Sequence, residues 1–250
     1  MESLFRYVAA PSACGYLPDQ QWSLEYEYVG ALTPGEYLQR LTEGWRRFGC
    51  MLFRPACRSC AACRSLRVPV DRFRPDRSQK RARRVNDGVV ELRVGRPSIT
   101  RTKLDLYDRY HSFQADHKGW PRHPAKDAAS YGDSFVRHPF PVEEWCYYLD
   151  GRLVGVGYVD VLGEEPPGAP AEGASERGLS AIYFFYDPLE RQRSLGTYNV
   201  LCVIDAARRR GLPYAYLGYY VEGGASMTYK THFTPNQLRG TDGVWRDFRG

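Results

Sequence analysis

Three cysteines stand three residues apart in a short basic segment, CRSCAACRSLRVPV, which spans residues 57–70. Cys57, Cys60 and Cys63 have the Cys-x2-Cys spacing at which a loop can wrap around a cation. A tetrahedral site needs a fourth ligand, and Cys14 or Cys50 could supply it. The spacing therefore predicts a structural metal site that holds zinc or an iron-sulfur cluster.

The same spacing is compatible with two roles that need no metal. The three cysteines could be small buried residues, or two of them could form a redox-active pair. Cys146 and Cys202 lie within apolar patterns, so we expect them in the core. A disulfide framework is not expected, because the seven cysteines are odd in number and the sequence starts without the charged and apolar stretches of a secretory signal.

The composition indicates a globular chain with an anionic partner. With 250 residues, 43% of them hydrophobic, the chain can bury a full core. No apolar run is long enough to span a membrane, so we expect no membrane partner and a cytoplasmic location. The net charge of +6 and the pI near 8.9 suit binding to an anion, if the charge is concentrated in one place.

The charge is concentrated in one segment. Residues 72–84, RFRPDRSQKRARR, hold seven lysines and arginines against one aspartate. Such a run is most often a solvated basic face, but these cations could also neutralise several RNA phosphates. The neighbouring thiols, which would fix the orientation of the segment, favour the RNA interpretation.

The rest of the sequence predicts a mixed α/β fold. In the first half, Thr33 caps a helix whose apolar stripe reaches Phe48 and ends at Gly49, and a second helix covers residues 104–113. In the second half, Asp150-Gly151 joins two strands as a hairpin, residues 163–178 form a flexible loop, and a strand-helix-strand unit covers residues 179–220.

The start of the helix in that unit is a candidate site for chemistry. Ser194 is a plausible N-cap, so the backbone N–H groups of Leu195, Gly196 and Thr197 would be free to bind an anion or an ester carbonyl. Arg193 and Gly196 nearly match the coenzyme A loop of GNAT acetyltransferases. The match fails at Tyr198, whose ring stands where a small residue lets the backbone approach the pyrophosphate.

Several segments together resemble the arginyl-tRNA-protein transferase family, including its bacterial leucyl-transferring branch. The segments YFFYDP (183–188), SLGTYNV (194–200), YLGYYVEG (216–223) and YKTHFTPNQL (229–238) resemble the family's C-terminal motifs. Three further segments resemble the family's N-terminal motifs: CGYLPDQ (14–20), RPACRSCAACRSLRVPV (54–70) and RSQKRARRVN (77–86). The resemblance covers nearly the whole chain. It departs from the family pattern at Gly223-Gly224, at His232 and in residues 110–121.

The resemblance implies an α/β (α+β) fold: a GNAT-like acyltransferase domain in residues 101–250 behind a smaller cysteine-bearing domain in residues 1–100. It implies transfer of leucine or arginine from its tRNA to the α-amine of a protein that begins with Asp or Glu, which marks that protein for degradation. The ester is already activated, so the chemistry needs no cofactor. The partners are a leucyl- or arginyl-tRNA and an acidic acceptor.

The reaction needs a group that holds the amine, an oxyanion site and contacts to tRNA. Asp187, at the carboxyl end of a buried strand, is the candidate for holding the amine, although it could be only a turn aspartate before Pro188. The complete catalytic set is Asp187, Ser194, Gly196, Thr197 and Tyr198. The tRNA set is Arg77, Lys80, Arg81, Arg83, Arg84, Tyr229 and Lys230, and the metal set is Cys14, Cys57, Cys60 and Cys63.

Two other functions fit parts of the sequence. One is a GNAT enzyme that transfers an acetyl group from coenzyme A, and the other is a metal-dependent RNA-binding module without enzymatic activity. A thermal-shift assay that compares acetyl-coenzyme A with aminoacyl-tRNA distinguishes the first function from a tRNA-dependent transferase. Transfer of an amino acid to an Asp-starting peptide would exclude the second.

Overall fold

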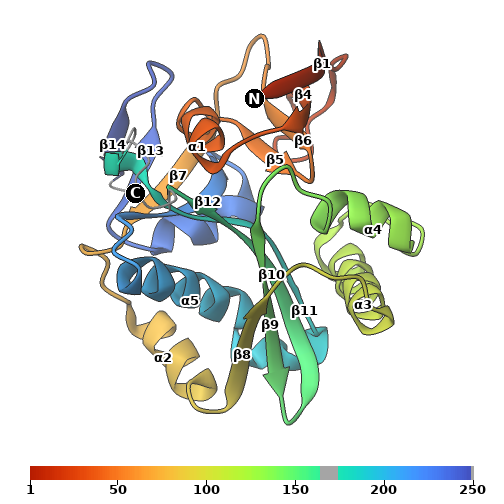
Figure 1. Ribbon diagram of the computed structural model, residues 1–250, viewed down its shortest axis with the longest axis vertical. Helices are drawn as coiled ribbons and strands as arrows, with labels where there is room; N and C mark the ends of the chain where they lie inside the picture. The colour runs from red at the N-terminus through yellow and green to blue at the C-terminus, as the bar shows by residue number, and fades with distance from the viewer. Residues whose placement is uncertain (164–173, 249–250) are drawn as a thin grey trace.

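The computed structural model describes residues 1–163 and 174–248, which form two main sheets of different size and the two-stranded sheet β2-β3 (Figure 1). Most of the loop expected at residues 163–178 therefore lies outside the described residues. The small sheet has the strand order β1-β4-β6-β5, and the large one has the order β14-β13-β7-β12-β11-β10-β9-β8. No helix in the described ranges has the length and apolar character needed to cross a bilayer.

The elements have the following bounds. The strands are β1 (Glu2–Val8), β2 (Ser12–Ala13), β3 (Gln21–Trp22), β4 (Leu24–Ala31), β5 (Arg46–Phe48), β6 (Met51–Pro55), β7 (Cys63–Pro69), β8 (Val90–Gly95), β9 (Val142–Leu149), β10 (Arg152–Leu162), β11 (Gly178–Tyr186), β12 (Tyr214–Val221), β13 (Asn236–Arg239) and β14 (Trp245–Phe248). The α-helices are α1 (Pro34–Thr42), α2 (Arg77–Asn86), α3 (Arg101–Lys118), α4 (Ala128–Phe135) and α5 (Leu195–Arg209). Three short 3-10 helices are η1 (Ala174–Glu176), η2 (Pro188–Arg193) and η3 (Ala225–His232).

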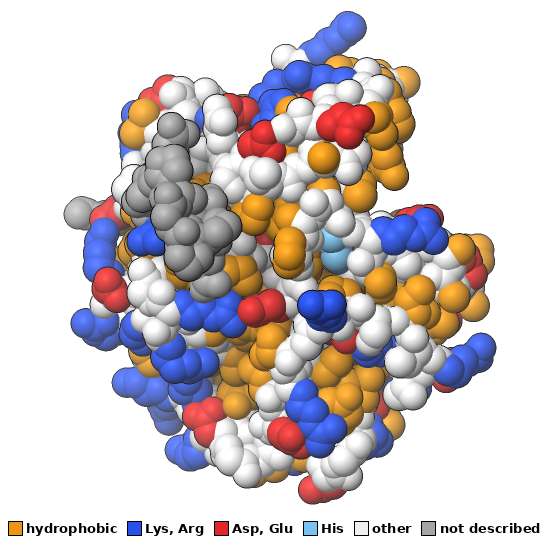
Figure 2. Space-filling model, viewed as in Figure 1, with side chains coloured by type: hydrophobic (Ala, Val, Ile, Leu, Met, Phe, Trp, Pro, Cys, Tyr) orange, Lys and Arg blue, Asp and Glu red, His pale blue; other side chains and the backbone are white. Residues whose placement is uncertain are grey.

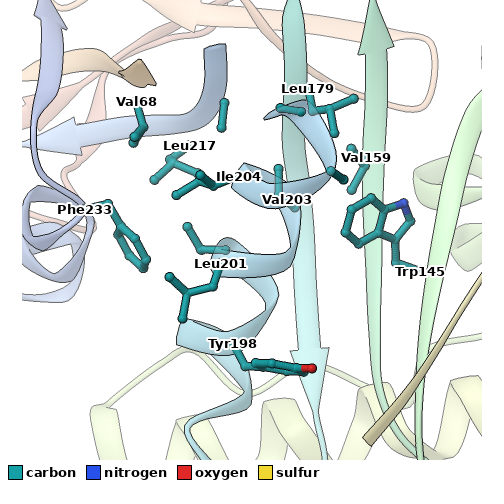
Figure 3. Packing of buried hydrophobic residues seen from close by; sticks show 14 of the residues in the cluster. Val68, Trp145, Val159, Leu179, Tyr198, Leu201, Val203, Ile204, Leu217 and Phe233 are labelled. Atoms are coloured by element: carbon teal, nitrogen blue, oxygen red, sulfur yellow. The ribbon is translucent and has the colours of Figure 1, made fainter. Parts of the chain in front are cut away.

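The large sheet lies between two layers. Helices α5 and α2 cover one face, while α3, α4 and the small sheet with α1 cover the other (Figure 1). Figure 3 shows how α5 packs: Leu201, Val203 and Ile204 point into a cluster with side chains of the sheet. Apolar contact on both faces explains why β11 reads as a nearly continuous apolar strand.

The strand-helix-strand unit and the hairpin are confirmed. Asp150 and Gly151 both have positive φ, 50° and 76°, as a two-residue hairpin turn requires. Strands β11 and β12 run parallel with α5 between them, but they pair only from Gly178 opposite Tyr214 to Ser180 opposite Tyr216. Beyond these residues the two strands no longer pair, which leaves an opening inside the mixed sheet.

Two expected helices have different bounds. Helix α1 ends at Thr42, because the chain turns at Gly44 (φ 99°), and Arg46–Phe48 forms a strand instead of a last helical turn. Trp45 is nevertheless fully buried, as the apolar stripe predicted. Helix α3 is longer than residues 104–113, since Thr100 caps its start and Gly119 ends it in the left-handed conformation.

Strand β7 joins the N-terminal half of the chain to the large sheet. It pairs with β12 on one side and with β13 on the other. Strand β8 forms an edge of the same sheet. The domain boundary near residue 100 stays a prediction. Strands β7 and β8, which precede residue 100, belong to the same sheet as β9 to β14, which follow it.

The small sheet is fastened to the large one by a buried ion pair. Arg47 of β5 donates to the carboxylate of Asp160 of β10, and neither side chain is exposed to solvent. Arg47 also contacts His138 at 2.9 Å and packs over the ring of Phe140. Burial raises the pKa of Asp160, although the charge of Arg47 opposes this effect.

Replacing Asp160 with alanine is expected to lower the free energy of unfolding by about 3–5 kcal/mol, because the Arg47 charge would stay buried without a partner. Urea denaturation followed by circular dichroism measures this change. Asp133→Ala is the matched control, since Asp133 pairs with Arg137 on the surface of α4 and its loss should cost less than about 1 kcal/mol. Equal effects of the two substitutions would contradict the fastening role.

Candidate functional site: the opening between β11 and β12

Asp187 follows β11 directly, as predicted, and its side chain is 3% exposed. One carboxylate oxygen accepts from the backbone N–H of Leu189 at 3.1 Å, and the other accepts from Arg152 at 2.5 Å. Arg109 approaches the same oxygen at 3.6 Å. These contacts are what a residue that caps a turn would make, so the amine-binding role of Asp187 stays a prediction.

Helix α5 begins one residue after Ser194. Ser194 occupies the N-cap position, but its φ of 54° is left-handed and its side chain makes no capping hydrogen bond. The expected N-cap position is therefore confirmed, but Ser194 also ends η2 and its hydroxyl does not cap α5. The backbone N–H of Tyr198 bonds to the carbonyl of Ser194 at 3.0 Å, so the amides of Leu195, Gly196 and Thr197 lie in the first turn, where helical amides have no partner inside the helix.

Tyr198 does not lie where the likeness to coenzyme A loops placed it. Its ring is buried in the core, 6.2 Å from the ring of Tyr147 between centroids (Figure 3). We expected this ring to keep coenzyme A away from the turn before α5. That expectation is wrong, because the ring points into the core and does not cover the turn. Gly196 borders open space, because a Cβ there would meet no atom within 4 Å.

The basic segment forms helix α2, which was not predicted as a helix from the sequence. The signal was present: Asp76 and Gln79 form a capping box. Arg77, Lys80, Arg81 and Arg84 are exposed, and Figure 2 shows Lys and Arg gathered along the lower left of the molecule, where Figure 1 places α2. Arg83 differs from these four, because it pairs with Asp205 of α5 at 2.6 Å.

Helix α2 and the start of α5 are joined by polar contacts. The amide of Asn86 donates to the carbonyl of Arg193 at 2.8 Å, and Arg193 donates to the carbonyl of Val85 at 2.9 Å. The structure therefore brings together three sequence-predicted groups: the end of the basic helix, the start of α5 and, through η2, Asp187.

The four thiols of the predicted metal set are neighbours. Cys63 lies in β7 and not in the loop that holds Cys57 and Cys60, which corrects the sequence interpretation. Burial raises the pKa of Cys63 to about 12, and the nearby thiols Cys57, Cys14 and Cys60 raise it further. In the two described ranges, however, no three Cys, His, Asp or Glu side chains form a group that could hold a metal. Metal binding thus stays a proposal.

The thiols do not lie beside α2. Cys63 begins β7 and pairs with Val221 at the end of β12, whereas α2 follows the other end of β7. The sequence interpretation, in which the thiols hold the basic segment in place, is therefore wrong. Cys63 lies near Tyr219 instead, whose pKa is raised mainly by burial and also by this thiol.

Tyr229 and Lys230, both predicted to contact tRNA, have different environments. Tyr229 is 48% exposed, whereas Lys230 is 9% exposed and donates to the carbonyl of Tyr219 at 2.7 Å. Burial lowers the pKa of Lys230 to about 7, and the charge of Arg46 contributes. Tyr219 lies beyond Tyr216, the last residue of β12 that pairs with β11, so Lys230 reaches β12 where the two strands have separated.

Two contacts between four residues of this region were not predicted from the sequence. Tyr183 of β11 shares a hydrogen bond of 2.8 Å with His111 of α3. Arg46 packs over the ring of Tyr219, with 5.1 Å between its guanidinium carbon and the ring centroid. No spacing in the sequence links these residues, because they come from four separate elements.

Comparison with known proteins now assigns the chain to a class. Residues 12–81 match the model for the N terminus of arginine-tRNA-protein transferase, and residues 102–240 match the model for its C terminus. The chain is 35% identical over 236 residues to an aspartate/glutamate leucyltransferase of Helicobacter hepaticus, covering 94% of this chain and 92% of that one. It is an aminoacyltransferase. More particularly, it belongs to the arginine-tRNA-protein transferase family.

Other relatives agree. Aspartate/glutamate leucyltransferases of Campylobacter jejuni and Pseudomonas fluorescens are each 35% identical, over 234 and 235 residues, which cover 91% and 93% of this chain and 90% and 92% of theirs. Among solved structures, L-PGS from Bacillus licheniformis overlaps with a TM-score of 0.42 and 14% identity, over 74% of this chain and 58% of that one. That likeness is too weak to carry an argument.

The exposed cations of α2 generate a prediction about tRNA binding. Replacing Lys80, Arg81 and Arg84 together with alanine is expected to weaken tRNA binding and to reduce the slope of log K against log salt by about one unit for each lost phosphate contact. Filter binding over a series of salt concentrations measures the slope. Arg137→Ala, an exposed arginine of the opposite layer, should leave it unchanged. An unchanged slope in the triple variant would place the tRNA on another surface.

The thiol cluster generates a second prediction. If the four thiols hold a structural metal, anaerobically purified protein contains about one zinc ion or cluster per chain, and Cys60→Ser loses the metal and unfolds at a lower temperature. Elemental analysis and ultraviolet-visible absorption measure the metal. Cys202→Ser is the control, because that thiol lies in α5. Wild-type protein without zinc or iron would exclude the metal site.

Proposed function

We propose that the protein transfers leucine from leucyl-tRNA to the α-amine of proteins that begin with Asp or Glu, and so marks them for degradation. One observation carries the proposal: relatives with 35% identity over at least nine-tenths of both chains are aspartate/glutamate leucyltransferases. Because the donor is aminoacyl-tRNA, we propose the cytoplasm as the place of the reaction. Coenzyme A transfer and non-enzymatic RNA binding are set aside, since the chain belongs to a tRNA-dependent transferase family.

The proposed reaction forms an amide bond and breaks the ester bond of the aminoacyl-tRNA. The acceptor's amine attacks as the free base, the carbonyl oxygen becomes an oxyanion, and a proton returns to the ribose oxygen. An α-amine has a pKa near 7.7–8.0, so modest assistance is enough to deprotonate it. The first-turn amides of α5 would stabilise the oxyanion, and α2 would hold the acceptor stem of the tRNA.

One experiment tests the proposal directly. The protein is incubated with a complete pool of charged tRNAs and an Asp-starting peptide, and the mass of the product is measured. We expect the peptide to gain one leucine. Gain of arginine would change the donor but keep the reaction class, whereas an unmodified peptide would contradict the proposed function.

Asp187→Asn tests the proposed amine-binding residue. We expect transfer to an Asp-starting peptide to fall by about a hundredfold, the scale of a lost general base, while aminoacyl-tRNA binding persists. Raising the pH should restore part of the rate, because the amine then arrives deprotonated. Single-turnover rates between pH 6 and 9 measure both effects.

Arg152→Gln is the matched control for this substitution. It breaks the same ion pair but leaves the carboxylate of Asp187 in place. A loss of similar size in both variants, without recovery at high pH, would show that Asp187 acts by supporting η2 and not by holding the amine.

A further inference from the structure

Two consecutive arginines of β5 are both buried but have different partners. Arg47 pairs with Asp160. Arg46, which is 6% exposed, forms no ion pair with any residue that the structure describes. Its Nη1 donates to the carbonyls of Trp45 at 2.5 Å and Leu41 at 3.3 Å, while its Nε and Nη2 are buried without a hydrogen-bond partner. A buried guanidinium without an acid is costly, so the site is suited to an anion from outside the chain.

The geometry of the unpartnered atoms indicates the kind of anion. The N–H groups of Nε and Nη2 lie side by side on one edge of the planar guanidinium, and this edge matches the two oxygens of a carboxylate. The ring of Tyr219 packs against Arg46, 5.1 Å from the guanidinium carbon to the centroid, which restricts its orientation. The hydroxyl of Tyr219 donates to the carbonyl of Gly44 at 2.6 Å, so the ring is itself fixed.

Lys230 adds a second buried cation beside the same tyrosine. An ammonium group has three N–H donors, and Lys230 uses one of them on the carbonyl of Tyr219 at 2.7 Å. Lys230 also forms no ion pair within the described part of the chain. The charge of Arg46 lowers the pKa of Lys230, as burial does, so the two groups are close enough to repel each other. An anion bound between them would relieve this repulsion.

We propose that the unpartnered edge of Arg46, with Lys230 beside it, binds the side-chain carboxylate of the acceptor's first residue. This inference rests on the proposed function, and it names the residues that would make the enzyme specific for acceptors that begin with Asp or Glu. A side-chain carboxylate suits the site better than a tRNA phosphate, because both cations are buried against an aromatic ring, whereas the cations of α2 are exposed. Arg46 and Lys230 also both contact Tyr219, which lies in the part of β12 that no longer pairs with β11.

The carboxylate must displace part of the protein to reach these groups, because both are buried. The neighbouring segment that borders solvent is η3, which carries Lys230 and the half-exposed Tyr229. It follows Gly223, whose φ is 78°. We therefore expect η3 to shift when an acidic acceptor binds.

The test compares four peptides that differ only in the first residue: Asp, Asn, Glu and Gln. Leucine transfer from leucyl-tRNA gives kcat/KM for each peptide with wild-type protein and with Arg46→Gln. Loss of charged hydrogen bonds should reduce transfer to the Asp and Glu peptides by about 10- to 150-fold, with less than about threefold change for Asn and Gln. The preference for acid over amide would therefore largely disappear, mainly through KM. Arg101→Gln, which removes an exposed arginine, is the control and should keep the preference.

Arg46→Lys keeps the positive charge but removes the two-pronged edge, so it should retain only part of the preference. If Arg46→Gln fails to fold, which thermal unfolding would reveal, the Arg46→Lys variant alone tests the proposal. An unchanged preference in either folded variant, an equal loss for all four peptides, or a loss of tRNA affinity would overturn the assignment. Wild-type protein that transfers to none of the peptides would instead contradict the proposed function.

Discussion

The buried pair of Arg47 and Asp160 determines how the two sheets of this protein meet. Neither side chain contacts solvent, and charges removed from water in this way are stable only when their geometry is fixed. Strand β5 is therefore held on β10, and Arg46, its neighbour in the chain, is held over Tyr219. Through this contact the small sheet reaches the part of β12 that no longer pairs with β11. A structural charge pair thus positions the residues of the neighbouring candidate site.

The opening has chemically different regions. The carboxyl end of β11 carries Asp187 and leads through η2 to the first turn of α5 and to the basic helix α2. The separated part of β12 carries Tyr219, whose carbonyl accepts from Lys230 of η3, and its last residue, Val221, pairs with Cys63 at the start of β7. A reaction between two large substrates needs such a division, because tRNA and protein must approach one ester from different sides. The exposed cations suit the polyanion, and the buried cations suit a small acid.

Local sequence signals predicted much of this fold but only part of the candidate site. The Asp150-Gly151 turn, the apolar strand β11 and helix α5 follow from patterns within a few residues. The strand at Arg46–Phe48 could not be predicted in this way, since Trp45 and Phe48 also fit one more turn of α1 and only the bend at Gly44 separates them from the helix. The contacts of Arg46 with Tyr219, and of Tyr183 with His111, depend on the packing of segments distant in sequence. Motifs identified the family, while tertiary structure brought these residues together.

The position of β7 also has a consequence for how the chain folds during synthesis. This strand, completed by residue 69, lies between β12 and β13, which follow about 150 to 170 residues later. During translation both of its edges therefore remain unpaired until almost the whole protein has left the ribosome. Sheets closed by such distant segments have high contact order and fold slowly, and open edges favour aggregation. The C-terminal strands are thus needed to complete the sheet around its N-terminal member, and a truncated chain would expose β7 to intermolecular pairing.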